Sequence, residues 1–251
     1  MTVSALIIAR NEEKKIEKCI DSLSFADEIV VVLDRSMDKT KKIVKRLNAS
    51  FFEGEWEFEG ERRNFGISKC SKDWILEVDA DEIISTKLAK EIKNNILKPE
   101  CDYYYIKLTN FVCNRPIKNG WMACLAPDGK FSLFRKKSKK WENQRVHPNY
   151  KLVGRKGEQF ENHIDHFMSD SISDLIMRFN RNTNLKAEDL NSETRIFRSY
   201  FSIRKVFSRF IKSFIKRKGY KEGLIGILIC ILNSIYPLVA AVKTEYLKKT
   251  S

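Results

Sequence analysis

The chain has 251 residues, of which 43% are hydrophobic, enough for one large core plus an appendage rather than for several domains. Lysine and arginine outnumber aspartate and glutamate by 47 to 33, and the net charge of +14 indicates a protein drawn to phosphate groups. The 6 cysteines are scattered without a C-x-x-C pair, which excludes a recognisable disulfide framework or zinc-ligand spacing and favours reduced thiols in the cytosol.

The first hundred residues alternate between apolar runs and helical patterns. Residues 3–8 are apolar without a basic leader or a cleavage site, so we interpret them as a buried strand rather than a signal peptide. This alternation predicts a mainly parallel α/β sheet. The expected strands are 3–8, 28–33, 51–52 and 74–78, and the expected helices are 16–23, 38–47, 62–70 and 86–97.

The pattern changes after Pro99. Shorter runs punctuated by glycine and asparagine, such as 103–108 and 130–134, are typical of mixed or antiparallel strands. We expect them to form a smaller mixed sheet fused to the parallel one.

The C-terminal part is basic, helical and apolar. Ten basic residues and no acidic one lie between Arg195 and Lys221, and large apolar residues repeat there at helical spacing. Residues 223–242 are nearly uncharged and as long as a spanning helix, although Asn233, Ser234, Tyr236 and Pro237 interrupt them and favour an interfacial or re-entrant hairpin. A solvated helix face is the alternative, but attachment to anionic lipid explains both the helical repeat of apolar residues and the positive charge.

Asp79 and Asp81 follow the apolar run 74–78 directly. Ligands of open α/β sheets bind at the carboxyl ends of the strands, and Mg²⁺ or Mn²⁺ is held by one or two carboxylates together with diphosphate oxygens. Alternatively, the two residues are a polar strand end and a helix cap. The other strand ends favour a metal site, because polar segments at 9–12, 34–40 and 62–64 would line the same nucleotide-sized crevice, where Asp34 can accept the imide N–H of a uracil-like base.

Four segments carry a family resemblance: ARNEE at 9–13, DRSMDKT at 34–40, RRN at 62–64 and DADE at 79–82. With them the chain resembles a family-2 glycosyltransferase with the GT-A nucleotide-diphospho-sugar transferase fold, a Rossmann-like sheet plus a smaller mixed sheet. Gly120-Trp121, Leu133-Phe134-Arg135 and Val146-His147 make it similar to the lipopolysaccharide inner-core β-glucosyltransferase branch.

The resemblance implies a set of site residues. Asp81 would be the principal residue of the catalytic metal site, and a late histidine of this fold, His166, is a further candidate ligand, although a hydrogen-bonded structural role is the alternative for it and for His147 and His163. The residues implied for the nucleotide are Ala9, Arg10, Asn11, Glu12, Asp34, Arg63 and Asp79, and those for Mg²⁺ or Mn²⁺ are Asp79, Asp81 and His166.

Enzymes of this family invert the anomeric centre, so a carboxylate must deprotonate the acceptor hydroxyl. Glu142 is our candidate base and Asp165 the second choice. Trp121 is either a sugar-stacking platform or part of the core. Arg35 and Met37 replace the small residues usual in the second motif, and Pro148 follows His147 where the branch often has glutamate, so the donor and the base stay open.

We therefore expect a GT-A domain at 1–190, with a nucleotide-sugar half at 1–98 and an acceptor half at 99–190, and a membrane-associating helical tail at 191–251. The predicted enzyme moves a hexose such as glucose from a UDP-sugar to a lipid-linked glycan of the lipopolysaccharide core. It would lie at an anionic surface on the cytoplasmic face of the inner membrane, peripheral or monotopic, without binding nucleic acid.

Three alternatives share parts of this pattern. A family-2 transferase acting on a polyprenyl phosphate, a capsule or another envelope acceptor would keep all donor-side residues. A basic nucleic-acid-binding protein would use the charge of +14 for phosphate contacts, but the apolar stripe between the basic residues of the tail argues against it. A nucleotide-binding protein without catalysis is compatible with Arg35 and Met37, whereas the intact DADE segment argues against it.

Overall fold

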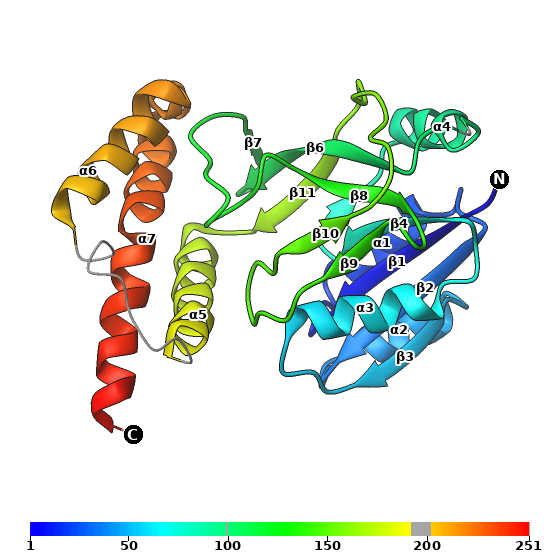
Figure 1. Cartoon of the computed structure of the whole chain (residues 1–251), viewed down its shortest axis with the longest axis horizontal. Coiled ribbons are helices and arrows are strands. Elements are labelled where there is room, and N and C mark those ends of the chain that lie inside the picture. Colours follow the sequence, from blue (N-terminus) through cyan, green and yellow to red (C-terminus); the bar gives the residue numbers. More distant parts are fainter. Residues whose placement is uncertain (99, 192–201, 251) are drawn as a thin grey trace. The chain divides into compact units, whose positions relative to one another are not determined.

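The computed structural model describes residues 1–98, 100–191 and 202–250. The chain forms two compact units that interleave along the sequence, and each is described here by itself (Figure 1). The first unit comprises residues 1–108, 129–144 and 148–167, and the second comprises 109–128, 145–147 and the chain from 168 onward.

The first unit is built on a parallel sheet in the order β3-β2-β1-β4. Its strands are β1 (Val3–Ala9), β2 (Glu28–Asp34), β3 (Ser50–Gly54) and β4 (Trp74–Asp79), and its helices are α1 (Ile16–Ser22), α2 (Thr40–Arg46), α3 (Glu59–Lys69) and α4 (Thr86–Asn95). All eight elements predicted from the sequence are present, and α3 begins three residues before its predicted start.

Every residue of β1 is buried, because the strand lies between β2 and β4 and both of its faces are covered. Ala5 and Ile7 belong to one hydrophobic core, with side chains of α1, α2 and α4. Leu6 and Ile8 point to the opposite face and belong to a second core that includes Ile67 of α3. Continuous burial explains why the run is apolar at every position rather than at every second one.

Antiparallel strands extend this sheet beyond β4, as the sequence predicted for the second half. β8 (Gly129–Arg135) pairs with β4, and β6 (Tyr103–Val112), β11 (Ile164–Ser169) and the short β5 (Glu82–Ile83) follow, with β7 (Arg115–Ile117) beside β6. Over the described ranges this makes one nine-stranded sheet, and β9 (Lys139–Trp141) with β10 (Tyr150–Leu152) forms a separate hairpin sheet. The register of β11 against β5 sets His166 opposite Glu82, close to the end of β4.

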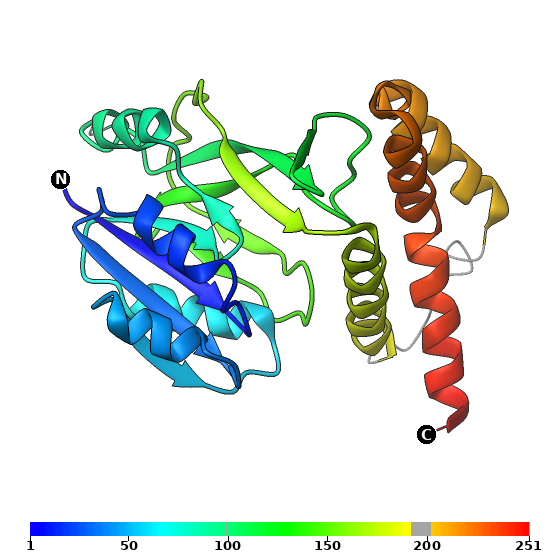
Figure 2. The same cartoon turned by 180° about the vertical axis from the view of Figure 1, so that it is seen from behind.

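The second unit is largely helical. It contains α5 (Ile172–Asn191), α6 (Ile203–Ile211), a π-helical turn η2 (Lys212–Lys216), a 3-10 turn η3 (Gly219–Glu222) and α7 (Gly223–Thr250). Helix α7 runs along α5 in both views (Figure 1 and Figure 2). Their shared core contains Trp121, Phe179 and Tyr236, so the described part of the tail packs with residues that the sequence assigned to the acceptor half.

The re-entrant hairpin predicted for residues 223–242 is wrong, because α7 is one continuous helix with Pro237 inside it. The polar residues that suggested an interruption form its buried face: Asn233 donates to the carbonyl of Gly120 at 2.9 Å, and the Tyr236 hydroxyl donates to the carbonyl of Asn182 at 3.1 Å. Length and composition would allow this helix to cross a membrane, yet 50% of its most apolar window is buried in the protein. The predicted boundary at residue 190 stays a prediction, since 192–201 lie outside the described residues.

Candidate active site

The loops that follow β1 and β2 are hydrogen-bonded to each other at the carboxyl edge of the sheet. The Asn11 side chain accepts from the backbone of Met37 at 2.8 Å, and the backbone of Glu12 donates to the hydroxyl of Thr40 at 2.8 Å. Asn11 and Arg35 both adopt left-handed backbone conformations, with φ of 56° and 48°. Non-glycine residues rarely take this conformation, and they concentrate at binding sites. Two of the predicted nucleotide-binding segments, 9–12 and 34–40, are therefore neighbours.

Asp34 is buried at the end of β2, and two arginines hold its carboxylate. Arg35 donates to both oxygens at 2.9 and 3.1 Å, Arg62 donates at 2.9 Å, and the backbone of Trp56 donates at 3.3 Å. Burial opposes the charge of Asp34, but the bond from Arg35 and the charge of Arg62 outweigh it and hold the pKa of this carboxyl below its usual value. The acceptor capacity that was predicted for a uracil-like base is thus taken up by Arg35 and Arg62 in this structure.

Glu77 lies in the middle of β4, and its side chain is 1% exposed. Arg63 of α3 donates to one carboxylate oxygen, and Lys139 of β9 lies 3.0 Å from the other. Trp141 donates its indole N–H to the same oxygen at 3.2 Å, and its ring stacks under the Arg63 guanidinium at 4.9 Å. Burial alone would raise the pKa of Glu77, yet Lys139 and Arg63 hold it below its usual value, while burial lowers the pKa of Lys139 to about 8. Both groups are therefore charged at neutral pH.

Asp79, at the end of β4, also lies between two cations. Arg63 lies 3.0 Å from one of its oxygens and Lys130 of β8 lies 3.0 Å from the other. Lys130 also contacts Glu82 at 2.7 Å, and Glu82 accepts from the backbone of Asp79 at 2.9 Å. Burial works against the charge of Asp79, but Arg63 and Lys130 lower its pKa, whereas burial raises the pKa of Glu82. Arg63, predicted at the nucleotide, is fully engaged with carboxylates here.

Asp81 and His166 are the predicted metal ligands that the fold brings together. The pairing of β5 with β11 leaves the histidine Nε2 3.5 Å from the Asp81 carboxylate, and both side chains are buried. A nitrogen and an oxygen at this separation can share one divalent ion. Within the described residues no three His, Cys, Asp or Glu side chains form a metal-binding group, so the predicted three-ligand set is not assembled. The physical reason is that the Asp79 oxygens are held by Arg63 and Lys130.

The remaining predicted residues lie at several places. Glu142 follows β9. Its backbone carbonyl lies so close to Gly60 of α3 that a Cβ at this glycine would clash with it. Asp165 is half-buried on β11 opposite Ile83, and burial raises its pKa. Trp121 is core: it is buried and donates its indole N–H to the carbonyl of Ile117 at 2.8 Å.

The model of Glycosyl transferase family 2 matches residues 4–170, which include every strand end described above. The chain belongs to glycosyl transferase family 2. An uncharacterized glycosyltransferase of Rickettsia typhi is 29% identical over 245 residues, covering 92% of this chain and 82% of the relative. LpsC of Rhizobium meliloti, named as a lipopolysaccharide core biosynthesis glycosyltransferase, is 25% identical over 254 residues, covering 97% of this chain and 92% of the relative.

Among solved structures, S. aureus TarS 1-349 in complex with UDP is similar to this family 2 enzyme with a TM-score of 0.51 and 16% identity, over 100% of this chain and 92% of that one. The fold is the GT-A fold, as the motifs predicted, and the protein is a glycosyltransferase.

Sequence reasoning named Arg63 but missed Glu77, Lys130 and Lys139 of this family 2 site. Glu77 carried a usable signal, because an acid inside an otherwise apolar buried strand requires a partner. Lys130 and Lys139 carried none, since a lysine in a short strand of mixed polarity is ordinarily a solvent-facing residue. Their partners lie 51 and 62 residues away in the sequence.

Lys139→Met should lower the free energy of unfolding by about 3 kcal/mol, because it leaves a buried carboxylate with one of its cations removed. Urea denaturation measures the change, with Lys140→Met, the exposed neighbour, as the matched control. The double variant Glu77→Gln with Lys139→Met should recover most of the loss. An equal effect of the two single lysine variants would contradict the role of Lys139.

Proposed function

We propose that this enzyme transfers a hexose with inversion from a UDP-sugar to a hydroxyl of a lipid-linked glycan, as in assembly of a lipopolysaccharide core. The observation that carries the donor side of the proposal is the buried cluster of carboxylates and cations at the carboxyl ends of β2 and β4. A nucleotide diphosphate needs both signs of charge, acceptors for its base and cations for its phosphates. The named role of the relative LpsC supports the acceptor class.

Asp81 and His166 would hold Mg²⁺ or Mn²⁺, together with oxygens of the diphosphate. When bound, the metal would neutralise the charge that develops on the departing UDP. Asp79 contributes differently, because it orients Arg63 and Lys130, which lie within 3.0 Å of it. Lys130 thus holds a positive charge beside the predicted metal ligands.

Arg62 is a second cation on the donor side. Its Nη1 donates to Asp34, while its buried Nε has no hydrogen-bond partner within the described structure. An unsatisfied buried N–H of a guanidinium is costly and is well suited to a phosphate oxygen. Glu142 would take the proton of the acceptor hydroxyl, a role that we carry over from its position in the sequence.

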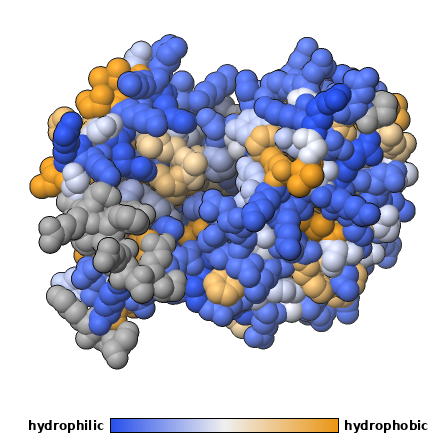
Figure 3. Space-filling model, in the orientation of Figure 1, coloured by the Kyte–Doolittle hydropathy of each residue, from blue (hydrophilic) through white to orange (hydrophobic). Residues whose placement is uncertain are grey.

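The membrane side of the proposal depends on α6. Ile203 and Phe207 are 81% and 68% exposed, and Arg204, Lys205 and Lys212 flank them. Figure 3 shows this apolar surface at its left edge, among polar residues, where α6 and the first turns of α7 lie. An apolar stripe bordered by cations complements the interface of an anionic bilayer. We therefore propose that the enzyme lies on the membrane as a peripheral or monotopic protein, at the cytoplasmic face of the inner membrane.

Asp81→Asn should lower sugar transfer roughly a hundredfold or more, since it removes one of two protein ligands of the proposed metal. Release of nucleotide from UDP-, GDP- and dTDP-sugars is measured with Mg²⁺ or Mn²⁺, with and without chelator, with extracted membrane lipid as acceptor. Asp21→Asn on the exposed side of α1 is the control. Full activity in chelator would refute the metal and leave charge neutralisation to Lys130 and Arg62.

Arg35→Gly should tighten UDP binding about fivefold, because Arg35 competes with the base for the oxygens of Asp34 through a partly exposed ion pair worth about 1 kcal/mol. Glycine also suits the left-handed backbone at this position. Titration calorimetry compares this variant with Lys18→Ser, which removes an exposed charge from α1. Weaker binding of UDP to Arg35→Gly would mean that Arg35 contacts the nucleotide itself.

Ile203→Ser with Phe207→Ser should lower partitioning onto anionic vesicles roughly tenfold or more, because two apolar side chains no longer enter the interface. Ile176→Ser with Met177→Ser on α5 is the matched control, since both residues are exposed in the same unit. Cosedimentation measures both. Point changes are preferable to truncation after Ser202, which would remove α7 from the shared core. Equal losses in the two pairs would contradict docking through α6.

A further inference from the structure

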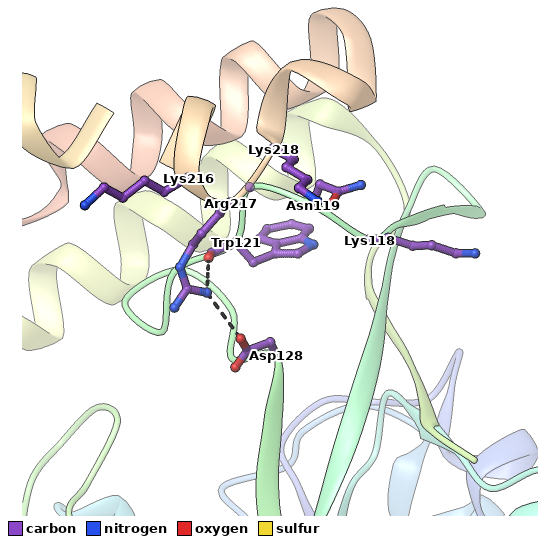
Figure 4. A pocket seen from close by; sticks show the side chains of 8 residues that line it. Lys118, Asn119, Trp121, Asp128, Lys216, Arg217 and Lys218 are labelled. Carbon is purple, nitrogen blue, oxygen red and sulfur yellow. Dashed lines mark hydrogen bonds and ion pairs between the residues drawn. The ribbon is translucent and has the colours of Figure 1, made fainter. Parts of the chain in front are cut away.

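The second unit contains a basic pocket with a cavity volume of about 280 Å³. Its lining comes from the loop after β7 and from the turn between η2 and η3: Lys118, Asn119, Gly120, Trp121, Asp128, Lys216, Arg217 and Lys218. Figure 4 shows Trp121 and Arg217 between Lys118 on one side and Lys216 on the other. The volume suits a phosphate group with a small substituent and is too small for a whole nucleotide-sugar.

Buried polar contacts hold the two walls of this basic pocket together at Gly120. Its carbonyl accepts from the Ser213 hydroxyl and from Asn233 at 2.9 Å, and its N–H donates to the carbonyl of Arg217 at 2.9 Å. Gly120 has a φ of 88°, and a Cβ there would lie 3.1 Å from the Cα of Gly219. The loop and the turn are therefore in close contact through backbone groups, and side-chain motion alone cannot separate them.

Glu222 fixes the other side of the loop. Its buried carboxylate accepts from the backbone of Lys118 and of Asn119 at 3.1 and 3.0 Å, and from the Asn119 side chain at 2.7 Å. One oxygen of this carboxylate thus satisfies the loop N–H groups, and the other lies 3.7 Å from Arg115. The pocket is thus a built feature, with its backbone determined by buried hydrogen bonds.

The residues that line the basic pocket carry an excess of positive charge. Of four lining cations, Arg217 is paired with Asp128 at 3.2 Å, whereas Lys118, Lys216 and Lys218 have no carboxylate within ion-pairing distance over the described ranges. The side chains of Lys118 and Lys216 extend to opposite sides in this structure (Figure 4), and bringing their charges together is unfavourable in the empty protein. A bound anion with several acceptor oxygens reverses the sign of that interaction, and a phosphate offers them.

An apolar hollow adjoins the basic pocket at Lys216, which lines both. This hollow has a volume of about 470 Å³ and is lined by Arg204, Phe207, Ser208, Ile211, Lys212 and Lys216. A small soluble phosphate ester has no hydrocarbon that could contact Phe207 and Ile211. An amphiphile, in contrast, can place its anionic group in one cavity and its hydrocarbon in the other.

We propose that the basic pocket binds the phosphate group of a lipid whose hydrocarbon lies in the apolar hollow along α6. The inference rests on the membrane part of the proposed function and makes it specific, because it names a site for one lipid phosphate in place of diffuse attraction to a charged surface. Glycosyl transfer itself is not needed for it.

The full chain is titrated by calorimetry with monomeric dihexanoyl phosphatidic acid, with glycerol 3-phosphate and with dihexanoyl phosphatidylcholine. Phosphatidic acid should bind roughly tenfold or more tightly than either of the others, because only it offers both a phosphate monoester and hydrocarbon. Lys118→Gln with Lys216→Gln should weaken that binding roughly tenfold. Lys221→Gln with Lys248→Gln removes the same charge from exposed positions outside both cavities and should leave the affinity unchanged.

Four results would overturn the proposal. Equal losses of affinity in the two double variants would mean that the overall positive charge, and not this pocket, binds the lipid. Equally tight binding of glycerol 3-phosphate would assign the pocket to a soluble phosphate, and equally tight binding of phosphatidylcholine, or none of any ligand, would remove the phosphate site. The titration contains neither vesicles nor a sugar donor, so failure of membrane docking or of transfer remains distinguishable from failure of the lipid site.

Discussion

The carboxylate of Glu77 lies between buried apolar neighbours in β4, and it keeps its charge only because Arg63 and Lys139 lie against it. Breaking such a pair leaves an uncompensated buried charge, which is strongly destabilising. The same Arg63 reaches Asp79, two residues further along β4. The position of α3, the hairpin β9–β10 and the end of β4 therefore depend on one buried acid.

The parallel half of the fold was predictable from the sequence, because β1, β2 and β4 are mostly apolar at consecutive positions and each is followed by a helical pattern. The acidic strand ends were predictable for the same reason, since parallel strands bring their carboxyl ends to one edge. Arg63 was predicted as a site residue, but Lys139 could not be, because it comes from β9 and no local pattern encodes its pairing with Glu77 across 62 residues.

The tail shows a different limit of sequence reasoning. Its composition resembles that of a membrane segment, and composition cannot tell a helix buried in protein from one buried in lipid. One face of α7 is buried in protein, because Asn233 and Tyr236 on that face are hydrogen-bonded to Gly120 and Asn182. Exposed apolar residues lie on α6, where the basic residues also are, and on the first turns of α7. A membrane-binding surface would therefore include a shorter and more amphipathic helix than hydropathy alone indicated.

Both acids expected to face the donor, Asp34 and Asp79, already lie between two cations. A nucleotide diphosphate that enters this site is itself an anion, so it would compete with the two carboxylates for their cations. Arg62 and Lys130 can exchange part of their interaction with carboxylates for phosphate oxygens without a change in the net charge of the protein. In the proposed mechanism a divalent ion at Asp81 and His166 would then balance the phosphate charge that these cations leave over. When the nucleotide diphosphate leaves, the carboxylates would return to their original partners.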